Sequence, residues 1–168
     1  GIPMTQTLAM AYPGDINLVA VEDEYIFCDN MLVAPIITSG ATSRKVTLPN
    51  GAWYNLWNGQ KTDGGKTITA SASLDTIPVY LKSGSVTPLN LSSELSLQKS
   101  GDVKTLLVTA PESYSETTVL MTDNNSFEYT VSKESDSLIT LTKESTDGYG
   151  TIILYGAKAT SVNADGVE

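Results

Sequence analysis

Residues 44–59 read RKVTLPNGAWYNLWNG, which is two short extended segments separated by a turn. Apolar side chains alternate over residues 44–48, and residues 52–57 predict a returning strand. Pro49-Asn50-Gly51 between them is typical of a tight turn, and Asn58-Gly59 predicts a second turn. The stretch therefore predicts two antiparallel β-strands joined as a hairpin.

The same rhythm of β-branched or aromatic runs and turn residues extends over most of the chain. Further strands are expected at residues 66–70, 77–81, 85–88, 103–109, 117–122, 127–131, 138–142 and 151–155. We predict an all-β fold, an antiparallel β-sandwich built as two small units. The polar stretch 90–102 marks the expected boundary between them. Residues 31–37 differ, since their continuous apolar run favours a fully buried strand of the kind found in parallel sheets.

Composition excludes several classes of function. The 168 residues carry a net charge of −9, which disfavours nucleic-acid and anionic-membrane partners, and the longest apolar run is too short to span a bilayer. There is no histidine, which removes the Ser-His-Asp and Cys-His constellations and the imidazole metal motifs. The single cysteine leaves the redox compartment undecided, whereas the richness in Ser and Thr leans towards an extracellular location.

No metal or cofactor is predicted. Asp123, Asn125 and Glu134 have the spacing of a calcium loop, but Phe127 and Glu128 occupy positions that need a ligand and a glycine. The glycines near residue 64 lack the phosphate-binding spacings. Hydrolysis of a glycoside needs two carboxyl groups that act as acid and base, and no pair of carboxylates is indicated here. Five that could in principle serve are predicted to be surface, cap or turn residues: Asp23, Glu24, Asp29, Asp75 and Asp102.

The aromatic cluster Trp53, Tyr54 and Trp57 is the candidate binding feature. Two-residue alternation places Trp53 and Trp57 on one face of the predicted strand. Flat aromatic rings on one face stack on sugars, but buried indoles are also common in β-sheet cores and interfaces. Packing is the favoured interpretation, and carbohydrate binding by these three residues is the alternative.

The order of several sequence blocks resembles glycoside hydrolase family 31. Residues 31–36 (MLVAPI), residues 40–59, residues 74–84 (LDTIPVYLKSG) and residues 86–89 (VTPL) follow the order and spacing that this family shows after its catalytic barrel. Upstream, residues 1–4 and 12–15 resemble the preceding barrel segment. The resemblance is strong over residues 1–89, and beyond them it lies only in length and strand rhythm.

The resemblance implies a parent enzyme that hydrolyses or transfers α-glycosidic residues with retention. Its aspartate nucleophile and aspartate acid/base would lie upstream of Gly1, so no catalytic residue is assigned to this chain. The implied domains are the end of a (β/α)8 catalytic barrel at residues 1–37, a proximal β-domain at residues 38–90 and a distal β-domain at residues 91–168. Gln6 and Thr7 stand where family members commonly have Arg-Pro, and Cys28 stands where a glycine is usual.

On this interpretation the β region is a non-catalytic scaffold that covers one side of the barrel, and the chain alone should expose an apolar patch where the barrel would lie. The runner-up is a carbohydrate-binding module with an exposed aromatic platform. A structural, adhesin-like β protein is the third interpretation, which the Ser and Thr content supports.

Overall fold

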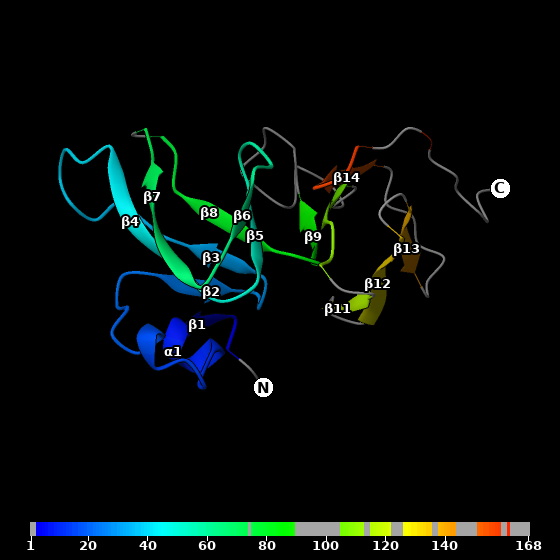
Figure 1. The fold of residues 1–168 in the computed structure, drawn as a ribbon, viewed down its shortest axis with the longest axis horizontal. Coiled ribbons are helices and arrows are strands. Elements are labelled where there is room, and N and C mark those ends of the chain that lie inside the picture. The colour runs from blue at the N-terminus through cyan, green and yellow to red at the C-terminus, as the bar shows by residue number, and fades with distance from the viewer. Residues whose placement is uncertain are drawn as a thin grey trace, which may run out of the picture.

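The computed structural model describes residues 3–73, 75–89, 105–112, 115–121, 126–135, 138–143, 151–158 and 161. Within them nearly all regular structure is β-strand (Figure 1), which confirms the all-β prediction. Two short helical turns occur near the N-terminus, α1 (Leu8–Ala11) and the 3-10 turn η1 (Ile16–Leu18). Neither is long and apolar enough to cross a membrane, and no other helix is found in the described residues.

Within the described residues the strands form four sheets. Sheet A has the order β1 (Thr5–Thr7), β2 (Tyr25–Phe27), β3 (Met31–Val33), β8 (Val79–Lys82), β5 (Ala52–Asn55) and β6 (Lys61–Asp63), all antiparallel. Sheet B pairs β4 (Ser43–Leu48) with β7 (Lys66–Ser71). Sheet C has the order β14 (Thr151–Tyr155), β10 (Thr105–Thr109) and β9 (Val86–Leu89). Sheet D has the order β11 (Ser115–Met121), β12 (Ser126–Ser135) and β13 (Leu138–Lys143).

Three apolar clusters stack these sheets in the order B, A, C, D. The first places Val46 and Leu48 of sheet B against Trp53 and Tyr80 of sheet A. The second places alternate residues of β10 against Tyr129 and Val131 of sheet D. Sheets A and B therefore form one packed unit, and sheets C and D form a second.

The third cluster joins the two units. Tyr54 and Leu81 project from sheet A onto Leu107 and Ala110, and Tyr155 packs at the edge. Because neighbouring residues of a strand point to opposite faces, β5, β8 and β10 are central strands buried on both sides. The sequence did not predict this packing of sheet A on sheet C.

Two expectations about residues 31–59 are wrong. The strands at 43–48 and 52–55 do not form a hairpin, because the turn after Pro49 carries the chain from sheet B to sheet A. The turn at residues 63–65 stabilises this crossing from sheet B to sheet A. The N–H of Gly64 donates to Gly51 O at 2.7 Å, and the N–H of Gly65 donates to Leu48 O at 2.9 Å. A Cβ on Gly64 would lie 1.8 Å from Pro49 O, so only glycine fits.

Residues 31–37 are not a fully buried parallel strand. Strand β3 ends at Val33 and lies between the antiparallel strands β2 and β8. Ile37 is 72% exposed. The parallel pairing was wrongly predicted because a continuous apolar run indicates only that a strand is buried on both faces. Central antiparallel strands of a multilayer fold are buried in the same way as parallel strands.

The expected domain limits stay a prediction. Strands β1 to β3, from the expected barrel end, lie in one sheet with strands of the expected proximal domain. Strand β9 pairs with β10, so the chain leaves sheet A for sheet C at Gly84-Ser85. The polar boundary expected at residues 90–102 and the carboxylate Asp102 lie outside the described residues.

The turn between β2 and β3 contains a strained cysteine. Cys28 has φ of 50° and Asp29 has φ of 62°, and Gln6 Nε2 donates to Asp29 Oδ1 at 2.6 Å. Asparagine and aspartate tolerate this left-handed region, whereas a residue such as cysteine pays about 1 kcal/mol for its Cβ. This conformation explains why a glycine suits position 28.

We expect Cys28→Gly to be more stable than Cys28→Ala by about 1 kcal/mol in urea unfolding. Both variants remove the exposed thiol, so the difference isolates the effect of the Cβ at positive φ. Equal stabilities would mean that the turn relaxes to negative φ when the sulfur is absent.

Candidate functional site: an arginine clamp and an exposed tryptophan turn

The three predicted binding residues do not share a face. Trp53 has 0% of its surface exposed and Tyr54 has 3%, whereas Trp57 is 57% exposed. Strand β5 ends at Asn55, so the two-residue alternation stops before Trp57. The predicted common face of Trp53 and Trp57 is therefore wrong, and the favoured interpretation of packing describes the surroundings of Trp53 and Tyr54.

Trp53 and Tyr54 pack in two different contacts between sheets. The Trp53 indole N–H donates to Pro49 O at 2.8 Å inside the core between sheets A and B. The Tyr54 hydroxyl donates to Ala110 O at 3.3 Å across the contact between sheets A and C. Burial raises the pKa of Tyr54, which keeps this hydroxyl a donor.

Trp57 lies in a turn that several hydrogen bonds hold rigid. The backbone N–H groups of Trp57 and Asn58 both donate to Asn55 Oδ1, at 2.8 and 3.3 Å. The Trp57 indole N–H donates to Ile77 O at 2.7 Å, and Ile77 is itself 48% exposed. The ring is thus fixed in orientation and open to solvent.

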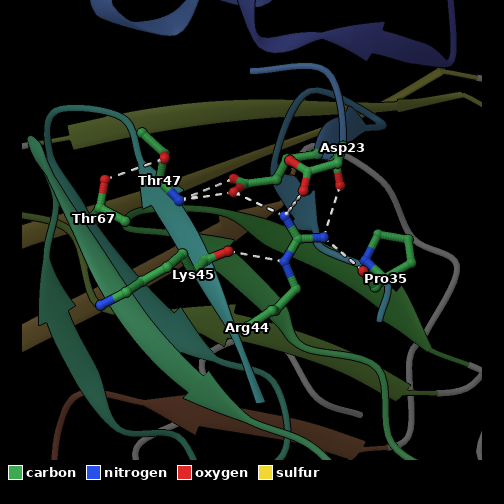
Figure 2. Close-up of polar contacts among 7 residues, drawn as sticks. Asp23, Pro35, Arg44, Lys45, Thr47 and Thr67 are labelled. Carbon is green, nitrogen blue, oxygen red and sulfur yellow. Dashed lines mark hydrogen bonds and ion pairs between the residues drawn. The ribbon is translucent and has the colours of Figure 1, made fainter. Parts of the chain in front are cut away.

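An arginine clamp is the most connected polar feature of the described residues (Figure 2). The Arg44 guanidinium pairs with Asp23 Oδ2 at 2.7 Å and Glu24 Oε1 at 3.3 Å. It also donates to the carbonyls of Asp23 and Pro35, at 2.9 and 2.6 Å. Asp23 and Glu24 precede β2, and Pro35 follows β3. The Arg44 side chain of sheet B therefore contacts both strands of the β2–β3 hairpin of sheet A at its open end.

Glu24 is the buried partner of the clamp, with 4% of its surface exposed. Its two carboxylate oxygens accept from the backbone N–H of Thr47 at 2.9 and 3.1 Å. Burial raises the pKa of Glu24 to about 7, although the Thr47 N–H and the Arg44 charge act in the opposite direction. Both carboxylates of the clamp hold one guanidinium, which is a structural arrangement rather than an acid and a base flanking a bond.

A pH dependence of stability follows from Glu24. The pKa is higher in the folded state than its ordinary value of 4.5, so the folded protein holds the proton more tightly. This contribution to stability is fully present below pH 4.5 and is lost as the pH rises to about 7, by at most about 3 kcal/mol. With no histidine in the chain, few other groups titrate in this window.

We expect urea unfolding between pH 5 and pH 8 to show this decline in the wild-type protein and a much flatter profile in Glu24→Gln. The amide keeps an oxygen for the Thr47 N–H but cannot titrate. Parallel profiles of the two proteins would place the responsible group elsewhere.

The other carboxylates have local partners. Asp75 accepts from Ser73 Oγ, which is the main cause that lowers its pKa, and Asp29 accepts from Gln6. In the described part of the chain no three His, Cys, Asp or Glu residues converge as a metal site. The exposed Glu134 lies in β12 and accepts from Thr140 Oγ1 at 2.8 Å.

Sequence reasoning missed the clamp and the layer contact made by Tyr54. Arg44 follows the adjacent residues Asp23 and Glu24 by about twenty positions, and the three share no spacing motif. A signal was present nevertheless, since a lone arginine in a strand that alternates apolar residues calls for a buried acidic partner.

Comparisons with known proteins agree on one family. Residues 1–87 match the model of the glycosyl hydrolase family 31 C-terminal domain. The isomaltosyltransferase of Sporosarcina globispora is 38% identical over 94 residues, which are 56% of this chain and 9% of that protein. An alpha-glucosidase of Saccharolobus solfataricus is 39% identical over 89 residues, which are 53% of this chain and 12% of that protein.

Among solved structures, the cycloalternan-forming enzyme of Listeria monocytogenes, in complex with a pentasaccharide substrate, superposes with a TM-score of 0.69 and 32% identity. The match covers 82% of this chain and 14% of that enzyme. The likeness therefore extends beyond residue 87, where the family model ends. The chain spans only about a tenth of the length of these curated relatives.

Proposed function

The chain belongs to glycosyl hydrolase family 31, as a non-catalytic C-terminal β region, and from this we propose that it supports the catalytic domain of a retaining α-glycosidase. The observation that carries the proposal is the family match over residues 1–87, which comprise the strands of sheets A and B and β9 up to Thr87. Asp23 and Glu24 hold the arginine clamp, and Asp29 and Asp75 accept local hydrogen bonds, which agrees with a supporting role.

The proposed substrates of the parent enzyme are α-linked glucosyl or closely related residues. Relatives carry the names isomaltosyltransferase, alpha-glucosidase and alpha-xylosidase, so the class of α-glycosidic bonds is shared while sugar and linkage differ. Hydrolysis and transfer both fit this class, because a glycosyl-enzyme intermediate is released to water or to another sugar.

The test compares the full-length protein that contains this chain with the 168-residue chain alone. We expect the full-length protein to cleave or transfer α-glucosyl groups from maltose, isomaltose or p-nitrophenyl α-glucoside, with retention at the anomeric carbon seen by NMR. The chain alone should be inactive. Hydrolysis by the chain alone would contradict the non-catalytic role, and a full-length protein without activity on any α-glycoside would contradict the glycosidase.

A second candidate function is carbohydrate binding at Trp57. The supporting observation is the exposed indole, held with its N–H turned to Ile77 O and its ring accessible. Trp53 and Tyr54 have no accessible ring face, so the platform would consist of Trp57 with the exposed amides of Asn58 and Gln60.

We expect such a site to give saturable quenching of Trp57 fluorescence by malto- or isomalto-oligosaccharides. The buried Trp53 supplies an internal reference with blue, sugar-insensitive emission. Trp57→Ala should abolish the quenching, whereas Ile152→Ala, at another exposed apolar residue, should leave it unchanged. Quenching that persists without Trp57 would exclude this site.

A further inference from the structure

The chain contains two asparagine-glycine pairs, Asn50-Gly51 and Asn58-Gly59. In such a pair the backbone nitrogen of the glycine can attack the side-chain carbonyl carbon of the asparagine, because glycine has no Cβ to hinder the approach. The reaction needs a glycine N–H that is not held in a hydrogen bond and a side-chain amide that is free to turn towards it. The structure gives the two pairs opposite environments in these respects.

The pair Asn58-Gly59 is held by hydrogen bonds at both reacting groups. The N–H of Gly59 donates to Asn55 O at 2.8 Å. The side-chain oxygen of Asn58 accepts from the N–H of Gln60 at 2.9 Å. The ring of Tyr155 also lies against Gly59, since a Cβ built on this glycine would be 3.1 Å from the ring. Both the nucleophile and the carbonyl of this pair are therefore engaged in the fold.

The pair Asn50-Gly51 has neither restraint. Both residues are exposed, and the N–H of Gly51 has no hydrogen-bond partner in the part of the chain that the structure describes. Asn50 lines a recess of about 480 Å³, so water reaches its side chain. The hydrogen bonds of this turn use the neighbouring carbonyls instead, because the N–H groups of Gly64 and Gly65 donate to Gly51 O and Pro49 O, at 2.7 and 3.2 Å.

We propose that Asn50 is a site of spontaneous deamidation and that the fold protects Asn58 from the same reaction. Hydroxide from solvent takes the proton of the Gly51 N–H, and the nitrogen forms a bond to Cγ of Asn50. The bond from Cγ to the side-chain nitrogen breaks, and this nitrogen leaves as ammonia after taking a proton from water. Water then opens the cyclic imide at either carbonyl, which leaves aspartate or isoaspartate at position 50. The net reaction consumes one water and releases one ammonia.

The modification would alter the turn by which the chain crosses from sheet B to sheet A. Both products add a carboxylate, and isoaspartate also adds one carbon atom to the main chain between Pro49 and Gly51. The carbonyls on the two sides of this atom are both in use, since Pro49 O accepts from the Trp53 indole and Gly51 O accepts from Gly64. The inference does not depend on the proposed function, because it requires only this turn and solvent.

Peptide mapping of the full-length protein tests the site. Trypsin cleaves after Lys45 and Lys61, so one peptide, residues 46–61, contains both asparagine-glycine pairs. The folded protein is incubated at pH 8 and digested, and fragment-ion mass spectrometry assigns the deamidated position. A sample digested without incubation gives the background. We expect Asn50 to react at least about ten-fold faster than Asn58, because Asn58 must first break its hydrogen bonds.

The same protein unfolded in urea is the control for the local sequence. Both pairs then lack their hydrogen bonds, so Asn50 and Asn58 should react at comparable rates. Asn50→Gln is the matched variant, since a side chain longer by one methylene closes the ring much more slowly. It should leave the peptide near the background. A ratio of the two rates that folding does not change, or a product in Asn50→Gln as abundant as in the wild type, would overturn the proposal.

Discussion

Replacing Arg44 with methionine is expected to lower the free energy of unfolding by about 3–5 kcal/mol at pH 8. Methionine keeps much of the aliphatic stem but removes the guanidinium. Glu24, with 4% of its surface exposed, is then left as a buried charge whose remaining donor is the backbone of Thr47. The carbonyls of Asp23 and Pro35 also lose their donor, so sheets A and B lose the link at the open end of the β2–β3 hairpin.

The loss of stability in Arg44→Met should depend on pH. This dependence distinguishes the effect of the unpaired Glu24 charge from that of the lost hydrogen bonds to the carbonyls. At pH 5 the carboxyl of Glu24 in the variant holds its proton, because removing the cation raises a pKa that is already about 7. The loss at pH 5 should therefore be smaller than at pH 8. The double variant Arg44→Met with Glu24→Gln should recover part of the loss at pH 8 and none at pH 5.

Lys45→Met is the matched control for the clamp. Lys45 follows Arg44 in β4 but points to the other face, where its Nζ donates to the exposed Thr69 hydroxyl at 3.1 Å. Its replacement should change stability by less than about 0.5 kcal/mol. A similar loss in both variants would show that the strand tolerates no methionine, and no loss in Arg44→Met would show that the clamp is not formed in solution.

The longer strands were predictable because their signal is local, whereas the three-residue strands β1, β2 and β6 were not expected. Residues 139–142, for example, alternate apolar and polar side chains, and β13 occupies Leu138–Lys143. Turn residues carry comparable information, since a positive φ at Gly51, Gly59 or Gly65 favours a residue without a Cβ. Such constraints act within a few residues, so the sequence displays them directly.

The pairing of strands and the clamp were not predictable, because both depend on contacts between distant residues. Strand β4 pairs with β7, across the strands that follow it, and Tyr54 packs on residues more than fifty positions later. Sheet C also contains a parallel pair, β10 with β14, which no local pattern distinguishes from an antiparallel one. The position of Trp57 was misjudged for a related reason: alternation fixes a face only while the strand continues, and β5 ends at Asn55.

The two tryptophans therefore make a sharp test of the layered fold. Trp53→Ala should cost about 3–5 kcal/mol, because it empties a fully buried indole site between sheets A and B. It also leaves Pro49 O without the indole donor 2.8 Å away, at the turn where the chain crosses between the sheets. Trp57→Ala removes an equal number of atoms from a site that is 57% exposed, and should cost less than about 1 kcal/mol.

Unfolding in urea followed by circular dichroism compares the two variants without relying on indole emission. Trp53→Phe is an intermediate variant, because phenylalanine fills most of the indole site but cannot donate to Pro49 O. Its loss of unfolding free energy should fall between those of the two alanine variants. Equal losses in Trp53→Ala and Trp57→Ala would mean that Trp57 is covered in solution.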